Sequence, residues 1–195
     1  MKTLSRNNSL VRAASLTLLA GIMPTLAYAH PGEAGGLAHG LAHPFSGLDH
    51  LCAMVAVGLW AAQMGGRAVW LTPLSFVAVM MLGGLLGMTA ISIPFAETGI
   101  VMSLLVLGLL IAAAIRLPLA LISVLVGVFA LFHGYAHGAE MSPGDSVFAY
   151  FSGFVLASVF LNLSGFAFGM LVRIYMQRLA GAAVAMAGGY LWFVV

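Results

Sequence analysis

The chain has 195 residues, of which 63% are hydrophobic and 6% are charged. A water-soluble domain of this length needs far more charge on its surface, so the composition excludes a soluble globular protein and indicates an integral membrane protein. The formal net charge is +2, but three of the seven basic residues lie within the first twelve positions, which argues against a nucleic-acid-binding surface.

The first 29 residues have the pattern of a signal peptide. Three basic residues precede an apolar run over 16–26, and a small-x-small sequence follows that ends at Ala29. Cleavage there would make His30 the mature N-terminus. The alternative is an uncleaved first transmembrane helix, although the apolar run is short and Pro24 interrupts it.

The mature chain then alternates apolar stretches with short interruptions that contain Gly, Pro, Arg or an acid. Crossing the hydrocarbon layer of about 30 Å takes about 20 helical residues. We therefore predict a periplasmic segment over 30–44 and a transmembrane domain over 45–195, an all-α polytopic bundle of six helices. The predicted helices cover 45–64, 68–91, 97–115, 117–138, 146–170 and 179–195.

The arginines of the mature chain predict its orientation. They follow the first, third and fifth predicted helices, at Arg67, Arg116, Arg173 and Arg178. By the positive-inside rule these loops are cytoplasmic, so both mature termini lie outside and the protein is a multi-pass membrane protein. All acids and histidines of the mature chain then map to the outer side.

One chemical motif opens the first predicted membrane helix. Pro44 suits a helix start, and His43, Asp49 and His50 lie around this entrance. Met54, four residues beyond His50, would share its face, where it could add a thioether ligand or simply pack in the core.

A second motif lies at the outer end of the fourth predicted helix. Steps of four and three residues place His133, His137 and Glu140 on one helical stripe. Imidazole nitrogen and carboxylate oxygen together suit a borderline divalent cation such as nickel, cobalt, zinc or copper. The single cysteine, Cys52, has no partner for a disulfide or a thiolate cluster, and we expect it to be a small buried residue.

Ionisable side chains in an apolar bundle are costly unless they are paired, hydrated or bound to an ion, so the combined set predicts metal handling. Glu97 has two interpretations: a favourable charge at a helix N-terminus, or a group that attracts the cation. His30, Glu33 and His39 could form an outer metal-collecting arm or a disordered tail.

The two motifs resemble those of the HupE/UreJ family, small bacterial membrane proteins of hydrogenase and urease gene clusters that are regarded as nickel permeases. The resemblance rests on H-P-x-x-G-x-D-H over 43–50 and H-G-x-x-H-G-x-E over 133–140. It implies functional roles for His43, Asp49, His50, His137 and Glu140, with Glu97 matching a family acid. Phe76 matches a family aromatic position, although by itself it reads as a lipid-facing or core residue.

We therefore predict a secondary transporter that takes up Ni²⁺ or Co²⁺ through an outward-facing site, without a permanent cofactor and without enzymatic activity. No P-loop is present to couple the chain to ATP. The alternatives are an intramembrane zinc-dependent hydrolase and a metal sensor without flux. The expected partners are the metal ion and the lipid bilayer, with a homo-oligomer or metal-delivery proteins as further candidates and no nucleic acid.

Overall fold

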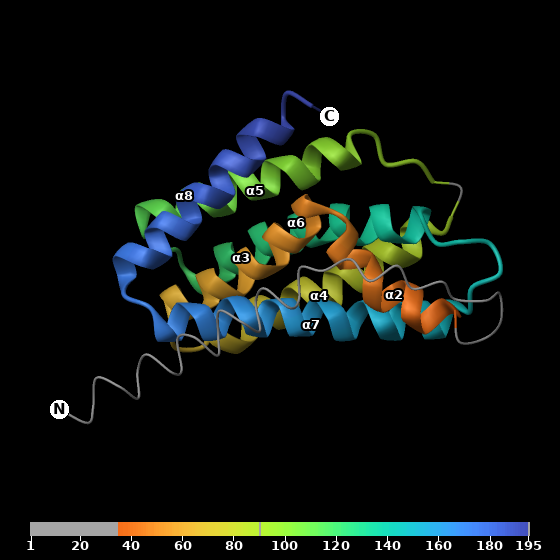
Figure 1. The fold of residues 1–195 in the computed structure, drawn as a ribbon, viewed down its shortest axis with the longest axis horizontal. Helices are drawn as coiled ribbons and strands as arrows, with labels where there is room; N and C mark the ends of the chain where they lie inside the picture. The colour runs from red at the N-terminus through yellow and green to blue at the C-terminus, as the bar shows by residue number, and fades with distance from the viewer. Residues whose placement is uncertain (1–34, 90, 195) are drawn as a thin grey trace. The chain divides into compact units, whose positions relative to one another are not determined.

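The computed structural model describes residues 35–89 and 91–194, and all regular structure in those ranges is helical. The predicted all-α class is therefore confirmed. The signal peptide, His30 and Glu33 lie outside the described residues. The helices are α2 (Gly35–Ser46), α3 (Leu48–Met64), α4 (Ala68–Gly87), α5 (Ala96–Ala113), α6 (Leu119–Ala139), α7 (Val147–Leu171) and α8 (Ile174–Leu191) (Figure 1).

Four of these helices, α4 to α7, are long and apolar enough to cross a membrane. The bent pair α2 and α3 would make a fifth crossing if it counts as one span. The chain is thus a multi-pass membrane protein. The sixth predicted crossing, which corresponds to α8, does not reach the same apolar level and stays a prediction.

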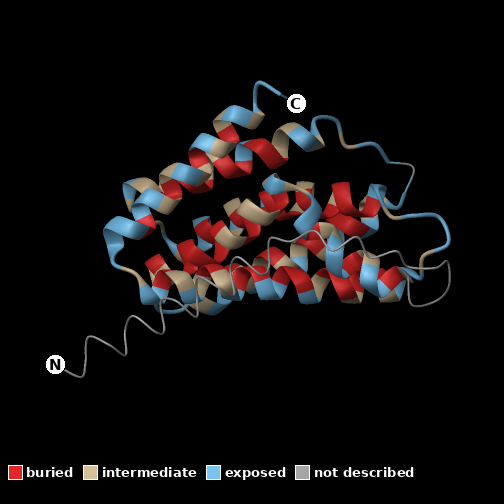
Figure 2. Cartoon of the chain, in the orientation of Figure 1, coloured by how far each residue is buried: buried red, intermediate tan, exposed pale blue. Residues whose placement is uncertain are grey.

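Exposed positions run along the outward faces of the helices (Figure 2), and many of them hold large apolar side chains. A soluble protein rarely exposes so much contiguous apolar surface, whereas lipid tails solvate it without cost. These side chains come from several helices and include Leu74, Leu82, Leu109, Phe160, Leu163 and Met170. The exterior therefore fits a hydrocarbon environment.

Glycines allow the closest helix contacts. A Cβ at Gly58 of α3 would overlap the backbone oxygen of Asn162 on α7, and a Cβ at Gly134 of α6 would overlap that of Met80 on α4. Small residues let backbones approach where no hydrophobic force drives helices together in lipid. The pairs α3–α7 and α4–α6 are fixed in register by these contacts.

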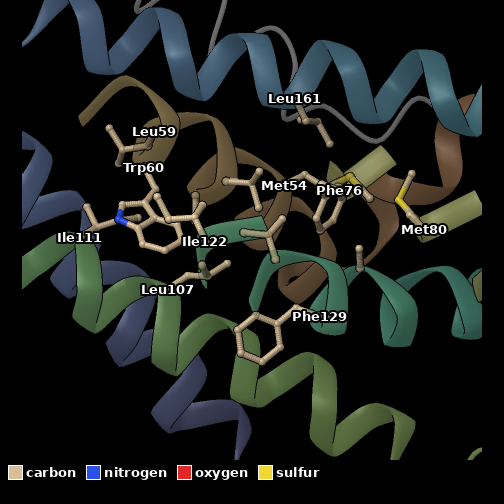
Figure 3. Close-up of a cluster of buried hydrophobic side chains, with 14 of the residues drawn as sticks. Met54, Leu59, Trp60, Phe76, Met80, Leu107, Ile111, Ile122, Phe129 and Leu161 are labelled. Carbon is tan, nitrogen blue, oxygen red and sulfur yellow. The ribbon is translucent and has the colours of Figure 1, made fainter. Parts of the chain in front are cut away.

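Between the helix pairs lies a cluster of buried apolar side chains (Figure 3). Trp60 of α3 is fully buried and belongs to the same cluster as Leu107 and Ile111 of α5 and Ile122 of α6. Dense packing of large side chains makes this part of the interior resistant to deformation. The apolar cluster therefore supports the polar side chains that are buried beside it.

The start of the first membrane helix differs from the prediction. Instead of one helix from residue 45, α2 begins at Gly35 and contains Pro44, and α3 begins after Gly47 at an angle of 84° to it. Pro44 cannot donate a backbone hydrogen bond, and Gly47 is extended, so the helical ladder breaks there. The prediction that Pro44 starts the helix was wrong.

Candidate metal site

The two sequence motifs meet at one end of the helices because α2 lies along the start of α7, near the end of α6. Gly36 and Gly40 of α2 approach the backbone of Ser146 and Tyr150 on α7. The end of α6 and the beginning of α7 are joined by a short connection, and both lie beside α2 at the right of Figure 1. Histidines from α2, α3 and α6 thereby become neighbours.

The outermost group consists of His43, His137 and Glu140. Each offers one ligand atom, and these three atoms all lie within 4.8 Å of one another. His43 Nε2 donates to a carboxylate oxygen of Glu140 over 2.9 Å. His137 is buried, whereas the Glu140 side chain is 53% exposed. The group therefore connects the surface with the interior and has a donor set suited to a divalent ion.

Two further imidazoles each use Nδ1 in a hydrogen bond. Nδ1 of His50 donates to the Asp49 carboxylate over 2.8 Å, and Nδ1 of His133 donates to the backbone oxygen of Phe129 over 2.9 Å. In both residues Nε2 is buried and has no hydrogen-bond partner among the described residues. Metal-binding histidines typically have this arrangement, in which a second acceptor fixes the tautomer and leaves a lone pair for the ion.

The four rings form a row that leads inward. The ring centroids of His43 and His137 are 4.7 Å apart, those of His137 and His50 are 4.3 Å apart, and those of His50 and His133 are 5.2 Å apart. His133 is fully buried. An ion could therefore exchange one imidazole for the next without leaving nitrogen ligands.

The fold thus brings all six predicted ligands to one region, but only three of them form the close outer group. Asp49 lies against His50, outside the group of His43, His137 and Glu140. Phe76 is fully buried and its ring lies 5.8 Å from that of His133, which places it in the core beside the site.

The predicted accessory residues are more scattered. Met54 is also fully buried and belongs to the same apolar cluster as Phe76 (Figure 3). Glu97 lies in the first turn of α5 and is exposed. His30 falls outside the described residues.

The sequence analysis missed the neighbours that surround the outer group. His39, expected on an arm or a tail, lies on α2 one turn before His43 and donates to Asp145 over 2.7 Å. The hydroxyl of Tyr150 donates to the backbone oxygen of His137 over 3.2 Å. The spacing of four between His39 and His43 is a helical signal that could have revealed this face.

Comparisons with known proteins give one family. The sequence profile described as "HupE / UreJ protein" matches residues 17–191. The protein named "Protein HupE" from Rhizobium leguminosarum bv. viciae is 45% identical over 181 residues, which cover 90% of this chain and 94% of that protein. No solved structure gives a significant match.

Proposed function

The chain belongs to the HupE/UreJ family, and we propose that it is a permease for a divalent transition-metal ion, most suitably Ni²⁺ or Co²⁺. The family is associated with nickel and cobalt transport in hydrogenase and urease systems. The observation that carries the proposal for this chain is the row of imidazoles from His43 to His133, because it joins an exposed carboxylate to the interior of a membrane protein.

Capture begins at His43, His137 and Glu140. A divalent ion arriving there breaks the hydrogen bond between His43 and Glu140. The Nε2 hydrogen of His43 passes through water to Nδ1, and the ion exchanges part of its hydration shell for the freed Nε2 lone pair and a carboxylate oxygen. The exposed carboxylate attracts the cation electrostatically. Because one ligand of the group, His137, is buried, binding at this group already moves the ion toward the interior.

Transfer inward uses His50 and His133. Their Nε2 lone pairs are available without breaking a hydrogen bond, since Asp49 and Phe129 hold Nδ1. His137 lies against His50 and is part of the outer group, so it serves as the shared ligand during exchange. Transport requires that each site bind the ion strongly enough to select it and weakly enough to release it.

The direction of transport follows from the charges. Arg67, Arg116 and Arg173 lie at the helix ends opposite to the imidazole row, and the positive-inside rule makes those ends cytoplasmic. The imidazole row then opens to the periplasm of the bacterial inner membrane, with the mature termini on the same side. The ion enters down its electrochemical gradient or in exchange with protons. Both modes are open because an imidazole can bind a metal ion or a proton.

Uptake of radioactive nickel into proteoliposomes tests this function. We expect metal-dependent flux with the intact protein and a loss of about tenfold or more in initial rate for His50→Ala and Glu140→Ala. Tyr135→Phe is the matched control. Tyr135 lies on α6, the helix that leads to Glu140, and its hydroxyl donates to the Ile91 carbonyl, away from the imidazole row.

Three other results would replace the proposal. The absence of flux in the intact protein would exclude a permease. Bound zinc together with hydrolysis of a lipid or peptide would identify an intramembrane hydrolase. Stoichiometric metal binding with neither activity would identify a sensor.

A further inference from the structure

Three buried amide side chains share one bonding pattern. Gln63 Nε2 donates to the Ile111 backbone oxygen over 3.1 Å, Asn162 Nδ2 donates to Ser158 over 2.8 Å, and Gln177 Nε2 donates to Gly169 over 2.6 Å. The three residues are 9%, 2% and 8% exposed. The oxygen of each amide accepts no hydrogen bond from any residue in the described ranges.

The acceptors determine how the amides are oriented. A backbone carbonyl can only accept a hydrogen bond, so the amide nitrogen must face it and the oxygen must point elsewhere. Three buried acceptors without partners are unusual in a native interior and call for a ligand such as a water molecule or an ion. In a membrane protein, buried polar groups of this kind often mark an ion path.

The two glutamines lie at the end of the molecule opposite to the imidazoles. Gln63 is in the last turn of α3, and Gln177 is in the first turn of α8. Gly169, whose carbonyl holds Gln177, packs against Ala62, the residue before Gln63. Gln63 itself bonds to α5, so the two amides lie at one junction where the ends of α3, α5, α7 and α8 meet.

Asn162 lies between this junction and the imidazoles. It is nearly two turns before Gly169 on α7, and its backbone touches Gly58 of α3. Along α3, His50, Gly58 and Gln63 follow one another over thirteen residues, which is about 20 Å at 1.5 Å per residue. The amides thus continue the direction of the imidazole row toward the cytoplasmic end.

We propose that the oxygens of Gln63, Asn162 and Gln177 form the inner, low-affinity part of the metal path. This inference rests on the proposed transport function and supplies the exit that the imidazole row lacks. Neutral amide oxygens bind borderline divalent ions more weakly than imidazole nitrogen does. An ion that retains part of its water shell passes from strong to weak ligands and is released to the cytoplasm.

The test separates flux from binding. Gln63→Leu and Gln177→Leu remove the oxygens at nearly constant size and add no ligand atom, and Ser103→Ala, a buried hydroxyl on α5 whose donor is satisfied, is the matched control. Nickel flux into proteoliposomes should fall about tenfold in the two leucine variants. The equilibrium affinity for nickel, measured by calorimetry on the purified full chain, should stay that of the intact protein and of Ser103→Ala.

A second variant, Gln63→Glu, guards against misfolding as an explanation. Its carboxylate should retain the ion, so that a second nickel binds per chain and flux slows. Intact flux in the leucine variants, with only a lower thermal midpoint, would show that the oxygens hold structural water and would overturn the inference. One nickel per chain and ordinary flux in Gln63→Glu would overturn it as well. If the intact protein itself shows no flux, the proposed function fails and the exit path fails with it.

Discussion

Asp49 and the Phe129 carbonyl act on the two inner imidazoles in the same way. Each accepts the Nδ1 hydrogen, from His50 or from His133, and so fixes the tautomer that presents an Nε2 lone pair. Asp49 also accepts the backbone N–H of His50 over 2.8 Å, which restricts the carboxylate itself. Asp49 is therefore a positioning residue for His50 in this structure.

Replacement of Asp49 by alanine should weaken nickel binding without unfolding the protein. The His50 ring would lose the acceptor that fixes its tautomer, and loss of such a partner lowers metal affinity about 10- to 100-fold. Asp49→Asn should give an intermediate value, since an amide oxygen can still accept the Nδ1 hydrogen. Calorimetric titration of the three proteins measures this, and equal affinities would mean that Asp49 does not position His50.

The break between α2 and α3 brings His43 and His50 to the same group of rings. A straight helix would place residues 43 and 50 two turns apart on one face, about 10 Å along the axis. The 84° bend at Gly47 instead turns α2 along α7, where His43 reaches Glu140 and His137. The backbone at Gly47 has φ −106°, which any residue can adopt.

Gly47→Ala should therefore disturb the site more than the fold. A Cβ at Gly47 would come within 2.5 Å of Asp49 Oδ1 and 3.0 Å of His50 Nδ1, so the pair must shift. We expect weaker nickel binding, by about tenfold, as when a metal-binding imidazole loses its hydrogen-bond partner, at a nearly unchanged thermal midpoint. Gly127→Ala is the control, because its Cβ would only touch Val79 at an ordinary 3.6 Å. Identical nickel affinities for the two variants would contradict this explanation.

In the described part of the chain, acidic and basic residues gather at opposite ends of the helices. The acids Asp49, Glu97, Glu140 and Asp145 lie at the end that holds the imidazoles, and the arginines lie at the other. The helix pairs α3–α7 and α4–α6 each combine one helix from the half before Leu117 with one from the half after it.

Accessibility of introduced cysteines tests the proposed orientation. In a Cys52→Ala background, a membrane-impermeant thiol reagent should label Ser142→Cys, in the connection between α6 and α7, in cells whose outer membrane is permeable. Ile115→Cys, beside Arg116, should react only after the inner membrane is opened. Both positions are exposed, so burial does not limit labelling. The opposite result would place the imidazole row on the cytoplasmic side.

The all-α membrane class and the six candidate ligands could be read from the sequence. Apolar stretches of membrane length and the spacing of His133, His137 and Glu140 are local properties, and a helix converts such spacing directly into a shared face. The same locality explains the error at Pro44. The proline and Gly47 suggest a boundary, but packing of α2 on α7 determines that a helix also forms before it.

Contacts between residues far apart in the sequence could be found only in the folded chain. His43 meets Glu140 across 97 positions, and Gln63 meets Ile111 across 48. No periodicity relates such residues, because their proximity depends on how glycines seat α2 and α3 against α7 and α4 against α6.

The sequence thus singled out the imidazoles and carboxylates that the fold gathers at one end of the helices. The tautomers of His50 and His133 are set locally, by Asp49 and Phe129 within four residues of each ring. The packing of the helices decided which imidazoles become neighbours and which amides lie beyond them, because those contacts join separate helices.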